Sequence, residues 1–177
     1  GTFSIESVLS SALSGNDHLL ILINGAYGER IARIAELHEI TNTCIEFNED
    51  TTPDVDTIRE ILEEEPSITH LAMVHCETTT GIVNSLSDFG ALCKEFGITY
   101  IVDAMSSFGA VPFNLAECNI DYLVSSANKC IEGVPGFSIV LAKRETLEAT
   151  EGNSRTLSFN LLAQWRGFEN NGQFRFT

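Results

Sequence analysis

Short apolar runs alternate with longer stretches of helical periodicity along most of this chain, and no other feature constrains its fold as strongly. The runs are too short for helices and lie at residues 18–24, 41–48, 69–75, 98–103, 120–125 and 137–143. Helical patterns are found at residues 5–13, 28–40, 55–64, 87–96 and 114–118, and residues 157–168 are amphipathic. This order is typical of successive βαβ units. We therefore predict an α/β fold with a mostly parallel sheet flanked by helices.

The length and the charge limit the class of protein. The 177 residues are 44% hydrophobic, which is enough to bury one substantial core. The 25 acidic and 10 basic residues give a formal net charge of -15, which would repel nucleic acid and the anionic face of a membrane. No apolar run approaches the ~20 residues of a membrane span, and the first residues lack the pattern of a signal peptide. We expect a cytoplasmic protein with neither nucleic acid nor a membrane as partner.

Both ends of the sequence are abrupt. A helical pattern at residues 5–13 starts the chain with no strand before it, and residues 170–177 contain no stop signal. We expect residues 1–177 to be a single domain that is truncated at both ends.

The cysteines and histidines do not indicate a disulfide framework or a metal site. The five cysteines are odd in number, widely spaced and without a CxxC pair: Cys44, Cys76, Cys93, Cys118 and Cys130. We predict that they are buried thiols. His75 and Glu77 flank Cys76, but adjacent residues in a strand point to opposite faces, so we reject a metal site there.

Polar segments follow four of the predicted strands, at residues 24–29, 75–81, 103–109 and 125–136. In open parallel sheets, functional groups gather beyond the carboxyl ends of the strands. Asp103 comes directly after an apolar strand, so its carboxylate is expected to be partly desolvated, which is costly unless a cation or donor meets it. A capping or turn aspartate would explain the same pattern.

Lys129 lies 26 positions after Asp103, at the next strand end. Its segment contains serines and the glycines Gly133 and Gly136, which allow backbone and hydroxyl groups to approach an anion closely. An isolated lysine is ordinarily a surface residue, but the pairing with a strand-end carboxylate favours a functional role. Pyridoxal 5'-phosphate (PLP) needs such a pair, because a lysine amine forms an imine with its aldehyde and a carboxylate keeps its pyridine nitrogen protonated.

Other residues could enclose a cofactor ring. Tyr27 could stack on one face, and Met105, two residues after Asp103, could contribute a sulfur contact. An ordinary turn tyrosine is the alternative for Tyr27. The hydroxyl groups of residues 78–80 could contact the ring oxygen or a substrate, although a solvated polar loop explains them equally well.

A family resemblance is carried by four segments: NGAYGER at residues 24–30, HCETTTG at 75–81, DAMSSFG at 103–109 and SANKCIEGVPG at 126–136. In their order and spacing they resemble the class V branch of the fold type I PLP-dependent aminotransferases. Within that branch, DAMSSFG and SANKC-x-x-GVPGF are similar to the 2-aminoethylphosphonate:pyruvate enzymes. The wider branch, including the alanine:glyoxylate and serine:pyruvate enzymes, shares only a looser Asp, Lys and Gly framework. The resemblance covers essentially the whole chain, including residues 154–165 and 174–177.

The resemblance implies a role for each matched residue. Lys129 would bind PLP covalently, and Asp103 would pair with the pyridine nitrogen. Tyr27 would stack on one face of the ring, with Met105 near the other. The remaining contacts would come from hydroxyl groups and small residues: Thr80, or as second choice Thr78, at the ring hydroxyl, and Ser126, Gly1 and Thr2 at the phosphate.

The resemblance also implies an activity. It is the transfer of the amino group of 2-aminoethylphosphonate to pyruvate, giving phosphonoacetaldehyde and L-alanine in phosphonate catabolism, by a homodimer. Alternatives are an alanine or serine aminotransferase of the same branch that uses glyoxylate or pyruvate, and a non-catalytic α/β interaction domain. Having both Asp103 and Lys129 argues against the last. The family's chains are about twice as long and bind the substrate's acidic group largely through an arginine with no counterpart here. We therefore expect the 177 residues alone to be inactive.

Overall fold

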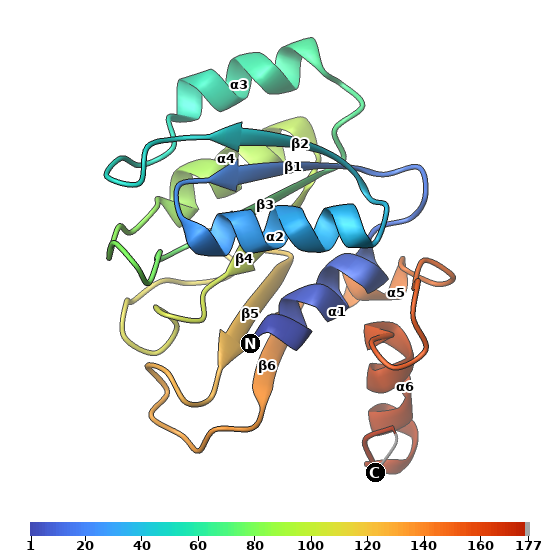
Figure 1. The fold of residues 1–177 in the computed structure, drawn as a ribbon. Coiled ribbons are helices and arrows are strands. Elements are labelled where there is room, and N and C mark those ends of the chain that lie inside the picture. Colours follow the sequence, from blue (N-terminus) through green and yellow to red (C-terminus); the bar gives the residue numbers. More distant parts are fainter. Residues whose placement is uncertain (176–177) are drawn as a thin grey trace.

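The computed structural model describes residues 1–175, so the last two residues of the 174–177 segment lie outside it. The strands of this part are β1 (His18–Ile23), β2 (Thr41–Glu46), β3 (His70–Val74), β4 (Thr99–Asp103), β5 (Tyr122–Ser126) and β6 (Ser138–Ala142). The helices are α1 (Thr2–Ala12), α2 (Ala26–Leu37), α3 (Val55–Glu64), α4 (Leu86–Phe96), α5 (Arg144–Glu148) and α6 (Leu161–Asn171) (Figure 1). Within residues 1–175, no helix is both long enough and apolar enough to cross a membrane.

The strands form one sheet in the order β2-β1-β3-β4-β5-β6. All neighbouring pairs from β2 to β5 run parallel, and β6 runs antiparallel to β5. The predicted α/β fold with a mostly parallel sheet is therefore confirmed. As a consequence, the carboxyl ends of β1 to β5 meet at one edge of the sheet, which we call the carboxyl edge. Their first residues meet at the opposite, amino edge.

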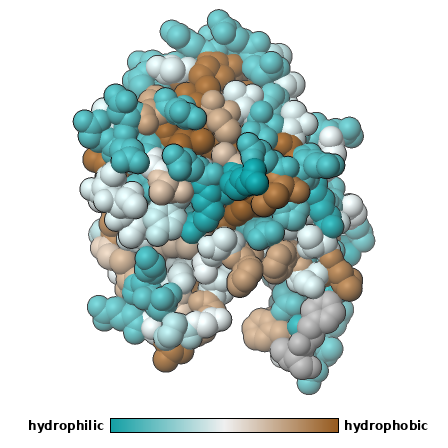
Figure 2. Space-filling view, viewed as in Figure 1, coloured by the Kyte–Doolittle hydropathy of each residue, from teal (hydrophilic) through white to brown (hydrophobic). Residues whose placement is uncertain are grey.

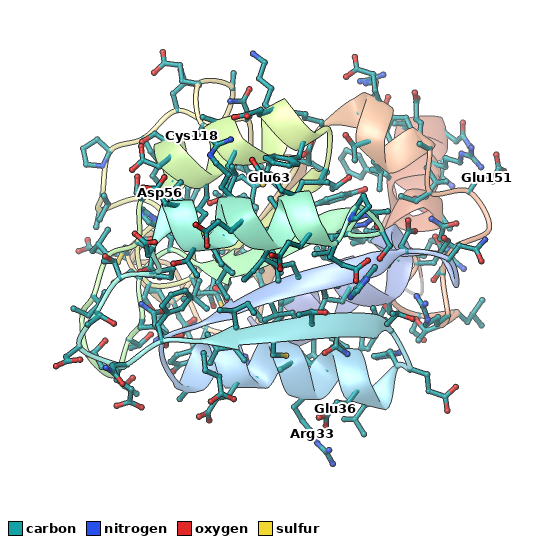
Figure 3. The ribbon with its side chains drawn as sticks, turned by 90° about the horizontal axis from the view of Figure 1, so that it is seen from above. Arg33, Glu36, Asp56, Glu63, Cys118 and Glu151 are labelled. Atoms are coloured by element: carbon teal, nitrogen blue, oxygen red, sulfur yellow. The ribbon has the colours of Figure 1, made fainter. Side chains whose placement is uncertain are left out.

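Helices cover both faces of the sheet. One apolar core joins the sheet to α1, α2 and α6, and a second joins it to α3 and α4. Figure 3, viewed from above, shows α2 on one side of the strands and α3 and α4 on the other. Because both faces are covered, every residue of β3 is buried, which is why this strand reads as a continuous apolar run.

The helix ends follow local signals in the sequence. The predicted helix at 55–64 matches α3, and the carboxylate of Asp54 accepts a hydrogen bond from the amide of Thr57 at 2.8 Å. Helix α4 ends at Phe96 and is capped by Gly97, whose φ of +67° is the left-handed conformation that favours glycine.

Some of the expected helices have other bounds in the structure, and the one expected at 5–13 is α1, which begins at Thr2 and ends at Ala12. The helix expected at 28–40 begins two residues earlier and ends at Leu37, because the chain turns at Glu39, where φ is +52°. Ile40 is buried, but it reaches the core after that turn. The amphipathic stretch at 157–168 becomes helical only at Leu161, after the cap residue Asn160.

The prediction of a helix at residues 114–118 is wrong. This segment is a hydrogen-bonded turn, in which the amide of Cys118 donates to the carbonyl oxygen of Asn114 at 3.0 Å. The prediction of buried thiols holds for Cys93 and Cys118 only, since Cys44 is exposed and the other two cysteines are half-buried.

A further hollow lies away from the predicted site residues. It has a volume of about 630 Å³ and lies between α1, β6, α5 and α6, where Val140, Leu161, Trp165 and Phe168 line it. Figure 2 shows the molecule hollowed between α6 and the rest of the chain. None of the residues that the sequence predicts for the site lines this hollow.

Candidate active site

A smaller cavity of about 220 Å³ lies at the carboxyl edge of the sheet. Residues from the ends of β3, β4 and β5 meet there with the first turns of α1 and α2. Most of the residues predicted from the sequence line this cavity: Gly1, Thr2, Tyr27, Thr78, Asp103, Met105, Ser126 and Lys129. The structure therefore brings together residues that are separated by more than 100 positions in the chain.

Asp103 is the last residue of β4, and its carboxylate is almost fully buried at 2% exposure. Its Oδ1 accepts a hydrogen bond from the amide of Met105 at 3.0 Å. Its Oδ2 lies 2.8 Å from Nη2 of Arg30. Burial raises the pKa of Asp103, and the Met105 amide and Arg30 offset only part of that effect. The ionised form of Asp103 is therefore unfavourable in the folded protein, and a second cation at this carboxylate would stabilise it.

Tyr27 and Arg30 lie three residues apart in the first turns of α2, so their side chains share one face of the helix. The guanidinium carbon of Arg30 lies over the Tyr27 ring, 4.4 Å from its centroid. The same guanidinium approaches the sulfur of Met105 at 3.9 Å and donates from Nη1 to the hydroxyl of Thr2 at 3.3 Å. A planar cation is thus held between an aromatic ring and a buried carboxylate.

Glu77 fixes the start of α2 from another part of the chain. Its side chain is fully buried, and its two oxygens accept the amides of Gly28 at 2.9 Å and Tyr27 at 3.2 Å. Gly25, the residue before α2, has no side chain to cap the helix, and a Cβ there would lie 2.7 Å from the Glu77 carboxyl carbon. Burial raises the pKa of Glu77 despite these hydrogen bonds. Glu77 therefore serves as a remote cap that places Tyr27.

Lys129 lies in the loop after β5 and is exposed at the mouth of the cavity. The loop is tightened by hydrogen bonds from the amide of Lys129 to the Ser126 carbonyl at 3.3 Å and from the amide of Gly133 to the Ala127 carbonyl at 2.7 Å. The hydroxyl of Ser126 donates to Oδ1 of Asn128 at 2.7 Å. The local turn therefore holds the lysine and the serine on the same cavity.

The structure separates the two threonines that the sequence proposed for the ring hydroxyl. Thr78 lines the cavity, and its hydroxyl lies 2.6 Å from that of Ser106. Thr80 is exposed and is not among the lining residues, and its hydroxyl accepts the amide of Ile82 at 3.3 Å. The geometry favours Thr78, which the sequence ranked second.

Gly1 and Thr2 line the cavity at the start of α1, the 11-residue helix that packs against β5 and β6. The carbonyl of Gly1 accepts the amides of Ser4 and Ile5, so it belongs to the first turn of the helix. A helix start offers amide donors and a partial positive charge to an anion.

Sequence reasoning missed Arg30 and Glu77 as site residues. Both lie in motifs that the sequence singled out, and the three-residue spacing from Tyr27 was a usable signal for Arg30. Nothing local indicated Glu77, because its partners are about 50 positions away. In the part of the chain that the structure describes, no group of three His, Cys, Asp or Glu side chains could hold a metal ion.

Comparisons with known proteins agree on one family. The family model described as Aminotransferase class-V matches residues 1–172. A 2-aminoethylphosphonate–pyruvate transaminase from Salmonella typhimurium is 52% identical over 178 residues, which cover 100% of this chain and 48% of that protein. The chain therefore spans about half the length of the curated relatives it matches.

Two solved structures show the same fold. The ureidoglycine–glyoxylate aminotransferase of Bacillus subtilis superposes with a TM-score of 0.89 at 25% identity, covering 99% of this chain and 47% of that one. The alanine–glyoxylate aminotransferase of a Nostoc species gives a TM-score of 0.87 at 26% identity, covering 97% and 46%.

Proposed function

The chain belongs to the class-V aminotransferases, and from this premise we propose that its protein transfers the amino group of 2-aminoethylphosphonate to pyruvate, giving phosphonoacetaldehyde and L-alanine. One observation carries the proposal. In a chain 52% identical along its whole length to a transaminase of that donor, Asp103, Tyr27 and Lys129 line a single cavity at the carboxyl edge of the sheet. This is the place where open α/β sheets bind ligands.

Class-V aminotransferases use PLP, and the residues of the cavity suit that cofactor. The structure already holds a flat cation there, the Arg30 guanidinium, against Asp103 and over the ring of Tyr27. A protonated pyridine ring is also a flat cation, and it needs the same two partners, a carboxylate and an aromatic face. When bound, PLP supplies an aldehyde that accepts the amino group and a ring that withdraws electrons.

The chain's own residues would divide the work of holding the cofactor. Asp103 would keep a positive charge at the ring nitrogen, and this interaction is strong because the carboxylate is buried. Tyr27 and Met105 would cover the ring, while Thr78 would contact its hydroxyl. Lys129 would attach the cofactor through Nζ and afterwards move the proton on the carbon that carries the amino group.

The phosphate would be bound by Ser126, Thr2 and Gly1, which line the same cavity. The hydroxyls of Ser126 and Thr2 line this space, and the first turn of α1, which contains Gly1, presents backbone amides. These are neutral donors that suit an anion. We also propose that residues 1–177 form one cofactor-binding domain and that the protein acts as a homodimer. The family resemblance supports both statements.

A screen of amino donors tests the substrate. The protein at its full natural length, loaded with PLP, is given 2-aminoethylphosphonate, alanine or serine as donor to pyruvate or glyoxylate. We expect a kcat/KM for the aminophosphonate with pyruvate that exceeds the others by at least about a hundredfold. Higher efficiency with alanine or serine would assign the protein to the rival branch. Absence of any transfer by a PLP-loaded protein would favour a non-catalytic domain.

A further inference from the structure

Both oxygens of the Asp103 carboxylate already have partners within this chain. The amide of Met105 donates to Oδ1, and Nη2 of Arg30 donates to Oδ2. The backbone donor is fixed by the turn after β4, whereas the guanidinium is at the end of a long side chain on α2. Any other cation that reaches Asp103 must therefore displace Arg30 or share Oδ2 with it.

Arg30 also covers the face of Tyr27, so it takes both partners that the cofactor ring needs. Its guanidinium lies 4.4 Å from the centroid of the Tyr27 ring and 2.8 Å from Asp103. We propose that Arg30 competes with the ring of PLP for the Asp103–Tyr27 site, neutralising Asp103 until the cofactor arrives and leaving when it binds. This inference rests on the proposed function, because it requires PLP to use Asp103 and Tyr27.

The contacts of Arg30 allow it to leave. Its side chain is 22% exposed, and its Nε is buried without a hydrogen-bond partner. An unsatisfied buried donor is destabilising, so the position of Arg30 against Asp103 and Tyr27 has a cost in free energy. Movement toward solvent hydrates the guanidinium and frees both Oδ2 of Asp103 and the ring of Tyr27.

The charges of the site also permit the exchange. Two buried carboxylates, Asp103 and Glu77, lie near the Arg30 guanidinium, and after burial the charge of Asp103 also raises the pKa of Glu77. A positively charged ring at Asp103 would bring a second cation to this pair. Arg30 would then face Glu77, which already accepts amides from the same first turn of α2.

The test uses Arg30→Gln and a matched control on the same helix. Arg33→Gln removes the same charge three positions further along α2, where the side chain is 69% exposed and pairs with Glu36 at 2.8 Å. Figure 3 shows Arg33 and Glu36 projecting away from the sheet. The full-length protein and both variants are prepared without cofactor. The rate of PLP binding is then followed by absorbance, and melting temperatures are measured with and without PLP.

We expect Arg30→Gln to bind PLP about tenfold faster and about tenfold more tightly than wild type. If Arg30 occupies the site in about nine molecules of ten, about one in ten is free to bind PLP, and the apparent affinity of wild type is lower by that factor. Without PLP, this variant should melt about 2–4 °C lower, because Asp103 loses its cation. With PLP the difference should disappear. Arg33→Gln should match wild type in both measurements.

A merely structural Arg30 would give a different pattern. Equal loss of melting temperature with and without PLP, or PLP binding no faster than wild type, would overturn the proposal. Arg30→Lys keeps the charge without the planar stacking group and should bind PLP at an intermediate rate, so it replaces the glutamine variant if that one does not fold. If wild type itself does not bind PLP, the proposed function fails, and that result is distinct from a wild type that binds while the variants show no gain.

Discussion

The two edges of the sheet both contain acidic residues, but they hold them in opposite ways. At the carboxyl edge, Asp103 and Glu77 are 2% and 0% exposed, and burial raises the pKa of each. At the amino edge, the side chains of Asp17 and Asp121 are 22% and 14% exposed. Burial also acts on Asp17, but hydrogen bonds from Ser14 outweigh it and lower the pKa of this carboxyl.

The ion-pair and hydrogen-bond partners of the carboxylates also differ between the two edges. Asp121 pairs with Lys143 at 2.9 Å and accepts the amide of Tyr100 at 2.8 Å, so it joins α5, β4 and β5 at the amino edge. Asp103 instead faces a cavity and an arginine that can reach solvent. An acid that is costly to ionise contributes little to stability, and such groups cluster at functional sites. The carboxyl edge thus places its buried carboxylate at a cavity, whereas the amino edge uses its carboxylate to join neighbouring elements.

The largest effect that separates the two edges is expected in turnover. Asp103→Asn should lower kcat at least about a hundredfold, because a neutral amide cannot stabilise the positive charge at the ring nitrogen. Asp121→Asn should leave kcat unchanged and lower stability by about 1–2 kcal/mol through weaker hydrogen bonds. Steady-state kinetics and urea unfolding of the full-length variants measure both. Equal turnover in the two variants would remove the distinction between the edges.

A smaller effect concerns the two carboxylates that cap helices. Glu77→Ala should weaken PLP binding about threefold to tenfold, because Tyr27 loses the cap that places its ring. Asp54→Ala removes the cap of α3, away from the cavity, and should lower stability without changing PLP affinity. A PLP titration of each variant is the measurement. If Asp54→Ala weakened PLP binding as much as Glu77→Ala, the loss of either cap would affect PLP binding only through the stability of the whole protein.

The smallest effect is the dependence of stability on pH. The pKa of Glu77 is raised from 4.5, so its contribution is fully present below that pH and is lost as the pH rises through the folded-state pKa. The pKa of Asp17 is lowered from 3.8, so its contribution is present above that pH and is lost as the pH falls. Relative to wild type, Glu77→Gln should therefore gain stability with rising pH above about 4.5. The free energy of unfolding of Asp17→Asn should approach that of wild type only as the pH falls. The measurement is the difference in free energy of unfolding between each variant and wild type, taken from urea unfolding at several pH values. If this difference changed with pH in the same direction for both variants, the comparison would be contradicted.

The strands follow from the local sequence pattern, and their positions were largely predictable. Strand β1 and helix α3 begin and end where the apolar pattern indicates. Likewise, the loops after four strands carry the polar residues that line the cavity. Parallel topology alone brings those loops together, so Asp103, Tyr27 and Lys129 could be named in advance.

The rest depends on contacts between distant segments. Arg30 was not predicted because its role comes from Asp103, 73 positions away. Thr78 lines the cavity and Thr80 does not, because the chain turns after β3, where the amide of Gly81 donates to the carbonyl of Glu77. A pattern of adjacent hydroxyls does not specify which one faces a cavity.

The central claim is that the carboxyl edge binds PLP through Lys129, and borohydride reduction of the PLP-loaded protein followed by peptide mapping tests it most directly. The 177 residues contain three lysines, which makes the outcome sharp: Lys129 at the carboxyl edge, Lys143 at the amino edge and Lys94 in the last turn of α4. The account predicts the reduced cofactor on Lys129. Label on Lys143, Lys94 or a lysine outside this chain would contradict it.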